Sequence, residues 1–349
     1  MDDLHGSPHN NTPRRSRREK EFALAHLLVS GGAGYIGSHA LLSLREAGHT
    51  AVVVDDLRAG HAFLAGDAPL ERIDVCDRDA LERLFARQRF DGVLHFAAYL
   101  SVAESVDQPL AYYRNNVGGS TALLEAAIAH DCRAFVLSST CATYGIPERV
   151  PIDEATPQRP IHPYGASKLV VEWMLAAAER AHGLRWAALR YFNAAGADAA
   201  GRAGECHEPE IHLVPSALQA AAGLREGLTL YGTDYDTPDG TCVRDYIHVT
   251  DLADAHVSAL EALLAGRQVG AFNLGTGRGT SNREVIDAVA RVVGKPVPVT
   301  EGPRRQGDPP LLVADASRFC REFGWEPRHS ELDNIVATAW AWLRKWKSL

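Results

Sequence analysis

A glycine-rich turn near the start of the chain joins an apolar run to a helical pattern, and this order constrains the fold strongly. Residues 26–30 indicate a short strand, Gly31, Gly34 and Gly37 follow at three-residue intervals, and the helical pattern after them stops at Gly48. Glycines in these positions let the backbone turn tightly, approach a pyrophosphate and pack the helix on the strand. The N-terminus of the helix then faces the bound anion. The segment therefore predicts a dinucleotide-binding unit.

An acidic residue after the next apolar run supports the same interpretation. Residues 51–54 indicate a second strand, and Asp55 follows it, 24 residues after Gly31. A carboxylate in this position binds the ribose hydroxyls of an adenosine and repels the additional phosphate of NADP. We therefore expect NAD as the cofactor, while Arg58 nearby leaves NADP open.

A tyrosine and a lysine one helical turn apart provide a candidate base. Tyr164 and Lys168 lie on the same face of a helix that starts at Pro163. A phenol has a pKa of about 10 and is a poor base near neutrality, but an adjacent ammonium favours the phenolate. This spacing alone also fits a solvated helix face. Together with the glycine turn and with Thr140, at the end of the apolar run 134–137, it indicates catalysis.

Apolar strands alternate with helical patterns over the first half of the chain. This alternation predicts an α/β fold with a doubly wound parallel sheet of the Rossmann type, and ligands bind at the carboxyl ends of such strands. A chain of 349 residues exceeds the usual size of one core, which favours two lobes. We expect a disordered tail over residues 1–24, an NAD-binding domain over 25–190 and a smaller, mixed α/β substrate lobe over 191–349. The return of parts of that lobe to the first domain is left open.

Composition and charge narrow the partners and the compartment. The net charge of −8 argues against nucleic acid, since phosphate binding needs a basic surface. Six scattered cysteines without a C-x-x-C pair argue against a disulfide framework and indicate a reducing compartment. The apolar runs are far shorter than the roughly 20 residues that cross a bilayer, and the basic N-terminal segment lacks the apolar core of a signal peptide. We expect a cytoplasmic protein with no membrane partner.

Two segments contain residue types that bind metals but lack the spacing of a known metal motif. His207 and His212 are five residues apart with Pro209 between them, so they would not share one helix face as a zinc motif requires. The acidic loop 234–240 has its glycine out of register for calcium and no closing glutamate. We expect no metal.

Several segments, in matching order over about residues 26–345, resemble the UDP-glucose 4-epimerase family of the extended short-chain dehydrogenase/reductase superfamily. The glycine turn and Tyr-x-x-x-Lys mark the superfamily, whereas residues 231–248 and 304–308 are the parts associated with the epimerases. The segments that carry the resemblance are 31–39, 164–168, 191–193, 243–249 and 304–308.

The resemblance implies reversible 4-epimerisation of UDP-glucose and UDP-galactose through a 4-keto intermediate, with tightly bound NAD and no net oxidation, as part of galactose metabolism. It implies that Tyr164 removes the proton of the sugar 4-hydroxyl and that Thr140 helps to relay it. Lys168 would lower the pKa of the tyrosine and hold the nicotinamide ribose.

The resemblance also assigns binding residues. Arginines suit a diphosphate because their planar forks match phosphate oxygens. The cofactor set is Gly31, Gly34, Tyr35, Ile36, Gly37, Asp55, Asp56, Asp74, Val75, Phe96, Ala97, Ala98, Asn116, Tyr164, Lys168 and Phe192. The substrate set is Thr140, Tyr164, Asn193, Arg244, Arg305, Asp308 and Leu312.

Three positions depart from some members of the family. Leu100 stands where some have lysine, so one cofactor contact is absent or is supplied by the backbone. His212 stands where some have asparagine, which leaves the uridine contacts open. Leu312 stands where some relatives carry a tyrosine beside the sugar. Because leucine is smaller, we expect UDP-N-acetylglucosamine to be a slower substrate beside the main pair.

The apolar helices predict assembly. Helices near 109–130 and 165–182 show more apolar surface than one sheet face needs, with Trp173, Leu123, Leu124 and Ile128 as candidates. Related proteins pair these helices into a four-helix bundle, so we expect a homodimer.

Other functions share some of these motifs with the epimerases. An epimerase for another UDP-sugar, such as UDP-N-acetylglucosamine or UDP-xylose, shares all of these motifs. A nucleotide-sugar dehydratase needs an Asp-Glu pair after the threonine, where this chain has Cys141 and Ala142. A dehydrogenase would release NADH, and a non-enzymatic NAD-binding regulator would not need Thr140, Tyr164 and Lys168.

Overall fold

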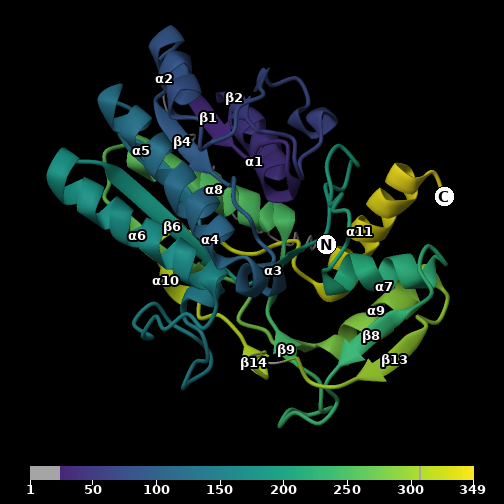
Figure 1. Cartoon of the computed structure of the whole chain (residues 1–349). Helices are drawn as coiled ribbons and strands as arrows, with labels where there is room; N and C mark the ends of the chain where they lie inside the picture. The colour runs from purple at the N-terminus through teal and green to yellow at the C-terminus, as the bar shows by residue number, and fades with distance from the viewer. Residues whose placement is uncertain (1–23, 306–307) are drawn as a thin grey trace, which may run out of the picture.

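Seven parallel strands form the central sheet of the chain (Figure 1). The computed structural model describes residues 24–305 and 308–349. The strand order is β11-β6-β5-β4-β1-β2-β3, and every neighbouring pair is parallel. The strands are β1 (His26–Ser30), β2 (Thr50–Val54), β3 (Leu70–Glu71), β4 (Gly92–His95), β5 (Ala134–Ser138), β6 (Arg185–Tyr191) and β11 (Gly270–Leu274).

The strand order reverses between β1 and β4. From β1 the chain first adds β2 and β3 on one side, and later adds β4, β5 and β6 on the other. Such a switch point opens a crevice at the carboxyl ends of the strands. The predicted α/β fold with a doubly wound parallel sheet is confirmed.

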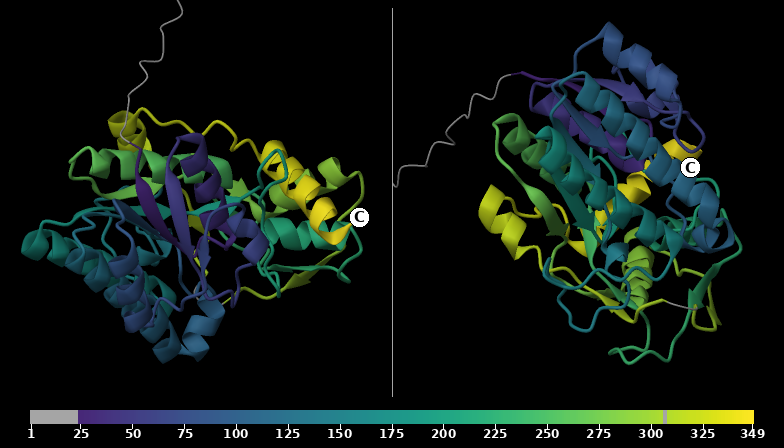
Figure 2. Two further views of the ribbon diagram at one scale, coloured as in Figure 1. Left: turned by 90° about the horizontal axis from the view of Figure 1, so that it is seen from above. Right: turned by 60° about the vertical axis from the view of Figure 1, so that its left-hand side comes forward.

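Helices cover both faces of this sheet, as Figure 2 shows. Along β1, Leu27 and Val29 belong to the core beneath α1 and α8, whereas Leu28 belongs to the core beneath α2, α5 and α6. This division follows from the strand, since successive side chains point to opposite faces. The helices are α1 (Tyr35–Glu46), α2 (Arg78–Arg87), α5 (Gly119–Ala129), α6 (Pro163–His182) and α8 (Val249–Leu264).

A smaller lobe packs three helices against short strands. Val214, Val289 and Ile335 come from its three helices and share one buried core. β8 pairs with β13 in parallel, and β9 lies between β12 and β14. The elements are β7 (Asn193–Ala195), α7 (Leu213–Ala221), β8 (Leu228–Tyr231), β9 (Val243–Arg244), β10 (Tyr246–His248), β12 (Thr280–Ser281), α9 (Asn282–Val293), β13 (Val299–Gly302), β14 (Leu311–Leu312) and α11 (Leu332–Lys347).

Three elements that follow residue 191 belong to the large domain. β11 is the outermost strand next to β6, α8 packs beside α1, and α10 (Ser317–Phe323) packs on β11. The two domains are therefore interleaved after residue 191. The boundary near residue 190 stays a prediction.

The helix predicted from about residue 109 to 130 is divided. α4 (Pro109–Tyr112) passes into a π-helical segment, Tyr113–Gly118, before α5 begins. The wider turn carries Asn116, whose side chain is buried and accepts a hydrogen bond from the Tyr99 backbone N–H at 2.8 Å. π-helical turns inside helices are frequent at functional sites.

Two expectations concern the ends and the surface of the chain. The predicted disordered tail, residues 1–24, lies outside the described residues except for Leu24. Among the described residues, none of the helices combines the length and the apolar character needed to cross a membrane.

Further short elements are α3 (Val102–Asp107) and the 3-10 turns Ala62–Ala65 and Cys141–Thr143.

Candidate active site

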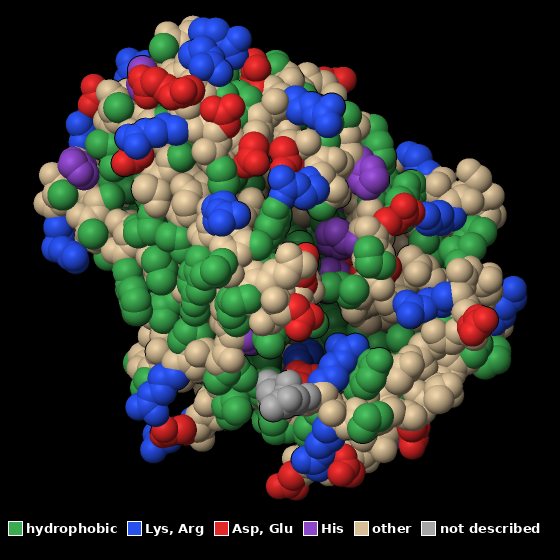
Figure 3. Space-filling model, in the orientation of Figure 1, with side chains coloured by type: hydrophobic (Ala, Val, Ile, Leu, Met, Phe, Trp, Pro, Cys, Tyr) green, Lys and Arg blue, Asp and Glu red, His purple; other side chains and the backbone are tan. Residues whose placement is uncertain are grey.

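A cavity of about 1150 Å³ opens at the carboxyl ends of the central strands. Figure 3 shows a hollow between the large domain and the smaller lobe, with histidine and acidic side chains along it. Single small-molecule pockets usually span about 300–1000 Å³. The cavity therefore has room for a dinucleotide together with a second ligand.

The glycine turn forms one end of the cavity, and its glycines are sterically required. Gly31 has φ +73°, and a Cβ there would lie 2.5 Å from the Ala97 backbone nitrogen. A Cβ on Gly37 would lie 2.2 Å from the Gly31 carbonyl oxygen. Gly34 is the N-cap of α1 and makes no side-chain cap, so the free N–H groups of the helix face the cavity. This cradle fits a pyrophosphate.

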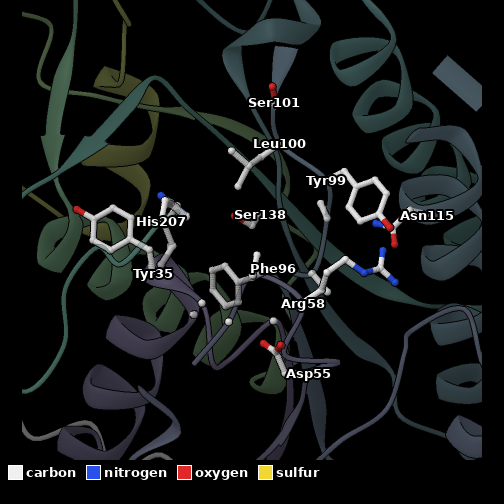
Figure 4. A pocket seen from close by; sticks show the side chains of 18 of the residues that line it. Tyr35, Asp55, Arg58, Phe96, Tyr99, Leu100, Ser101, Asn115, Ser138 and His207 are labelled. Atoms are coloured by element: carbon white, nitrogen blue, oxygen red, sulfur yellow. The ribbon is translucent and has the colours of Figure 1, made fainter. Parts of the chain in front are cut away.

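Asp55 lies in the position expected for a ribose ligand. Its carboxylate is buried and accepts hydrogen bonds from the N–H groups of Ala33 at 3.1 Å and Leu57 at 2.9 Å. Burial raises the pKa of Asp55, and these two bonds oppose the rise. The backbone thus fixes the carboxylate in the wall of the cavity, as Figure 4 shows.

Arg58 is engaged by neighbouring carboxylates. Its guanidinium lies 3.2 Å from Asp56 and 3.7 Å from Asp74, and it lies over the Tyr99 ring at 5.2 Å from the centroid. The two carboxylates repel the additional phosphate that NADP would bring to this arginine. The site therefore favours NAD over NADP, as expected from Asp55.

Most of the remaining expected cofactor residues line the cavity. Asn116 is an exception, because its side-chain amide donates to the Tyr99 carbonyl oxygen at 3.1 Å and to Ser167 at 3.0 Å, which fixes the loop after β4. Asn115 and Tyr99 line the cavity instead, and no pattern in the sequence distinguished them. The expected residues that do line it are Gly31, Gly34, Tyr35, Ile36, Gly37, Asp55, Asp56, Asp74, Val75, Phe96, Ala97, Ala98, Tyr164, Lys168 and Phe192.

Thr140, Tyr164 and Lys168 meet on one wall of the cavity. Thr140 follows β5, and its hydroxyl accepts a hydrogen bond from the Ala142 N–H at 3.1 Å. Tyr164 is in the first turn of α6, and Lys168 follows one turn later. The Lys168 ammonium is buried and donates to the Ser138 carbonyl oxygen at 2.9 Å.

Burial shifts the pKa of both groups. It raises the pKa of the Tyr164 phenol, Tyr191 adds to the rise, and the Thr140 hydroxyl opposes it. Burial also lowers the pKa of Lys168 to about 8, against the Glu172 carboxylate. The phenol therefore starts from a pKa above its usual value, and the lowering of that pKa by Lys168 stays a prediction.

The expected substrate residues fall into two groups. Thr140, Tyr164 and Asn193 line the cavity, whereas Arg244, Arg305, Asp308 and Leu312 lie outside its lining. Arg244 pairs with the Asp308 carboxylate, and β14 sets Leu312 opposite Arg244 in parallel register.

Leu312 and Arg305 make different contacts. Leu312 packs against a buried cluster that contains Cys141, next to Thr140, and Phe192, which lines the cavity. The Arg305 guanidinium lies 4.2 Å from the centroid of the Tyr231 ring.

The loop between β7 and α7 supplies another part of the wall, which the sequence analysis missed. Glu205, His207 and His212 all line the cavity, and Figure 4 shows His207 beside Tyr35. As expected from Pro209, the segment is not helical. The loop nevertheless brings its two histidine rings to 5.2 Å between centroids.

Comparison with known proteins agrees with this geometry. Residues 27–275 match the model of the NAD dependent epimerase/dehydratase family. The chain belongs to this family. Its similarity to UDP-glucose 4-epimerases, inferred from the motifs, is also confirmed by relatives that match along nearly their whole length.

Among these relatives, the UDP-glucose 4-epimerase of Rhizobium meliloti is 51% identical over 317 residues, which are 91% of this chain and 96% of that protein. The UDP-glucose 4-epimerase of Halalkalibacterium halodurans is 48% identical over 90% of this chain and 95% of its own length.

A crystal structure of UDP-glucose 4-epimerase from Brucella ovis in complex with NAD has a TM-score of 0.89 and 48% identity, covering 91% of this chain and 98% of that one. The enzyme from Stenotrophomonas maltophila, with bound NAD and formylated UDP-arabinopyranose, has a TM-score of 0.89 and 42% identity, covering 93% and 99%.

Proposed function

We propose that this chain is a UDP-glucose 4-epimerase that interconverts UDP-glucose and UDP-galactose with NAD bound in the cavity. The observation that carries the proposal is the meeting of Thr140, Tyr164 and Lys168 in one cavity with the glycine turn and Asp55. The relatives at about half identity, named UDP-glucose 4-epimerases, support the same reaction.

The cofactor would be held by groups that fit its parts. The N–H groups at the start of α1 suit the pyrophosphate, Asp55 suits the adenosine ribose, and Lys168 suits the ribose of the nicotinamide. When bound, oxidised nicotinamide supplies a reversible acceptor for the hydrogen of carbon 4 and a positive charge.

The protein groups then manage the proton. Tyr164, as a phenolate, takes the proton of the sugar 4-hydroxyl while a carbonyl forms at carbon 4, and it returns that proton when the carbonyl is reduced from the other face. Thr140 provides a hydroxyl beside the same oxygen. The Lys168 ammonium lies on the neighbouring turn of α6 and stabilises the phenolate by its charge.

The proposed substrate contacts lie on the side of the smaller lobe. Asn193 lies at the cavity, and Arg244 and Arg305 offer guanidinium groups to a diphosphate. Arg244 is paired with Asp308, so its guanidinium would have to leave this carboxylate or bind the diphosphate and the carboxylate together. Leu312 is proposed to border the sugar and to permit some activity on N-acetylated UDP-sugars.

We further propose that the chain serves galactose metabolism in the cytoplasm and forms a homodimer. Trp173 on α6 is 62% exposed and Leu110 on α4 is 74% exposed, and Figure 3 shows hydrophobic side chains gathered on the side of α4 and α6. Leu123 and Leu124, two of the expected dimer residues, are instead buried in the core beneath α5 and are withdrawn from the interface. Light scattering at micromolar concentration should give twice the chain mass, and a monomer would contradict this assembly.

One assay separates the candidate functions. Purified protein is given UDP-galactose without added NAD, and the nucleotide sugars are resolved while absorbance at the NADH band is followed. An epimerase forms UDP-glucose with no standing gain in NADH. A dehydratase forms a 4-keto-6-deoxy sugar, a dehydrogenase accumulates NADH, and a regulator forms no product. UDP-N-acetylglucosamine and UDP-xylose, tested in parallel, identify an epimerase for another UDP-sugar.

A further inference from the structure

Four side chains of the loop between β7 and α7 converge on one point. Glu205, His207, Glu210 and His212 each offer one ligand atom, and these atoms all lie within 4.8 Å of one another. The Glu205 Oε1 atom lies 2.8 Å from His207 Nδ1 and 2.7 Å from His212 Nδ1. His212 Nδ1 also lies 3.0 Å from Glu210 Oε1. One nitrogen of each ring therefore points at the carboxylates.

The charges of this cluster need compensation. The side chains of Glu205 and Glu210 are only 8% and 4% exposed. Two buried carboxylates carry a large desolvation cost unless positive charge lies beside them. Protonating both histidines would supply that charge but would bring two cations together, since their ring centroids are 5.2 Å apart. One divalent cation neutralises both carboxylates and leaves both rings neutral.

We propose that Glu205, His207, Glu210 and His212 bind one divalent transition-metal ion of the zinc type. Imidazole and carboxylate are the ligands that such ions accept, with bonds of about 2.0–2.2 Å. Ligand atoms of a tetrahedral site then lie roughly 3.3–3.6 Å apart. The closest pairs of the cluster need to open by about half an ångström or more to reach that spacing, and the most distant pair needs to close.

The place of the cluster indicates what the ion does. His212 is the N-cap residue of α7, and the Glu205 carbonyl oxygen accepts a hydrogen bond from Trp342 Nε1 of α11 at 3.0 Å. The His207 ring contacts the edge of Tyr35, the first residue of α1, with centroids 6.3 Å apart. The ion thus joins the loop to the start of α7 and stiffens the wall of the cavity beside the glycine turn. Its role is structural.

From the sequence we expected no zinc because His207 and His212 lack the spacing of a helical zinc motif. That criterion does not apply to a loop, where histidines five residues apart can face one another. The loop also contains Glu208, which is exposed and pairs with Lys347 at 2.7 Å, outside the cluster. Glu208 therefore provides a matched control carboxylate.

The test uses the full chain without an affinity tag. The protein is stripped with EDTA, exchanged into metal-free buffer and titrated with Zn²⁺ by calorimetry, with Co²⁺ as a spectroscopic probe. We expect one equivalent of Zn²⁺, visible Co²⁺ absorption bands, and a melting temperature that rises by several degrees with saturating Zn²⁺ because the ion binds only the folded chain.

Variants locate the ion. His207→Gln and Glu205→Gln should each weaken Zn²⁺ binding by at least roughly tenfold, since even residues behind the ligands can contribute 10–100-fold. Glu208→Gln should leave the affinity and the stoichiometry unchanged. Melting in EDTA shows whether each variant folds, and the wild-type titration decides the question if one of them does not.

Two results would overturn the inference. Wild-type protein that takes up no Zn²⁺ at micromolar free concentration would show that the cluster is a metal-free network of carboxylates and histidines. Zinc bound equally well by the wild type, His207→Gln and Glu205→Gln would show that the ion lies elsewhere.

Discussion

Replacing Glu172 by glutamine should both destabilise the fold and lower the pKa of Lys168, the proposed catalytic lysine. Glu172 lies on α6 one turn after Lys168, and its side chain is 4% exposed. Arg190 of β6 donates hydrogen bonds to both carboxylate oxygens of Glu172, with nitrogen to oxygen distances of 3.0 Å and 2.6 Å. Ser139, the residue before Thr140, donates to the same carboxylate at 2.6 Å. One ion pair therefore ties α6 to the strands that carry the proposed catalytic groups.

The cost follows from burial. Burial alone would lower the pKa of Arg190, but its bonds to Glu172 outweigh burial and raise it. Glu172→Gln leaves that guanidinium buried without a counter-charge, and breaking such a pair costs about 3–5 kcal/mol. For a chain of 349 residues, this corresponds to a melting temperature lower by roughly 4–7 °C.

The same change acts on the catalytic pair. The Glu172 carboxylate opposes the burial that lowers the pKa of Lys168 to about 8. Without this carboxylate the pKa falls further, and the ammonium is lost at a lower pH. Turnover of the wild type should decline above about pH 8, where Lys168 becomes neutral, and the decline should begin at lower pH in Glu172→Gln.

The assays are thermal melting and a profile of kcat against pH with UDP-galactose. The matched control is Glu179→Gln on the same helix. Its carboxylate accepts a hydrogen bond from neutral Trp186 Nε1 at 2.7 Å, which a glutamine oxygen can also accept. If Glu172→Gln melts within about 1 °C of the wild type, or no lower than Glu179→Gln, the ion pair does not stabilise the fold as argued. An unmoved alkaline limb would refute its link to Lys168.

Three further outcomes test the proposed site. Tyr164→Phe should lower kcat at least about a hundredfold with little change in UDP affinity, since it removes only the proton-carrying oxygen; near-normal turnover would exclude this base. NAD should stay bound through purification and appear on acid release, because each turnover restores it, and a nucleotide-free preparation with full activity would contradict that. Leu312→Tyr should lower kcat/KM for UDP-N-acetylglucosamine relative to UDP-glucose by about tenfold or more; an unchanged ratio would show that Leu312 does not border the sugar.

The parts of the fold that the sequence predicts are those fixed by local chemistry. A Cβ cannot fit at Gly31 or Gly37, so the glycine spacing alone specifies the turn. Asp55 follows a buried strand whose end is fixed by its apolar run. Parallel strands align their carboxyl ends, which brings Asp55 and Thr140 to one crevice although 85 residues separate them.

The remaining features depend on long-range packing that spacing does not encode. Leu123 and Leu124 fit an apolar surface in the sequence, yet both pack into the core because α2 and α6 cover α5 on two sides. The return of β11 and α8 to the large sheet is likewise decided by which apolar faces meet. The predicted helix from residue 109 is interrupted because the Asn116 side chain binds the Tyr99 backbone and holds a wider turn.

In the proposed catalytic pair, helical spacing predicts where the two side chains lie but not how their surroundings shift their pKa values. Tyr164 and Lys168 lie in the same cavity, as the helical spacing requires, but the surroundings that bring them together also bury both groups. Burial raises the pKa of the phenol and lowers that of the ammonium, so it opposes the phenolate on both counts. Lys168, with a pKa of about 8, keeps its charge near neutral pH, and bound oxidised nicotinamide would add a second positive charge to the cavity. When bound, oxidised nicotinamide would favour the phenolate of Tyr164 in the state in which the hydrogen of carbon 4 can be accepted.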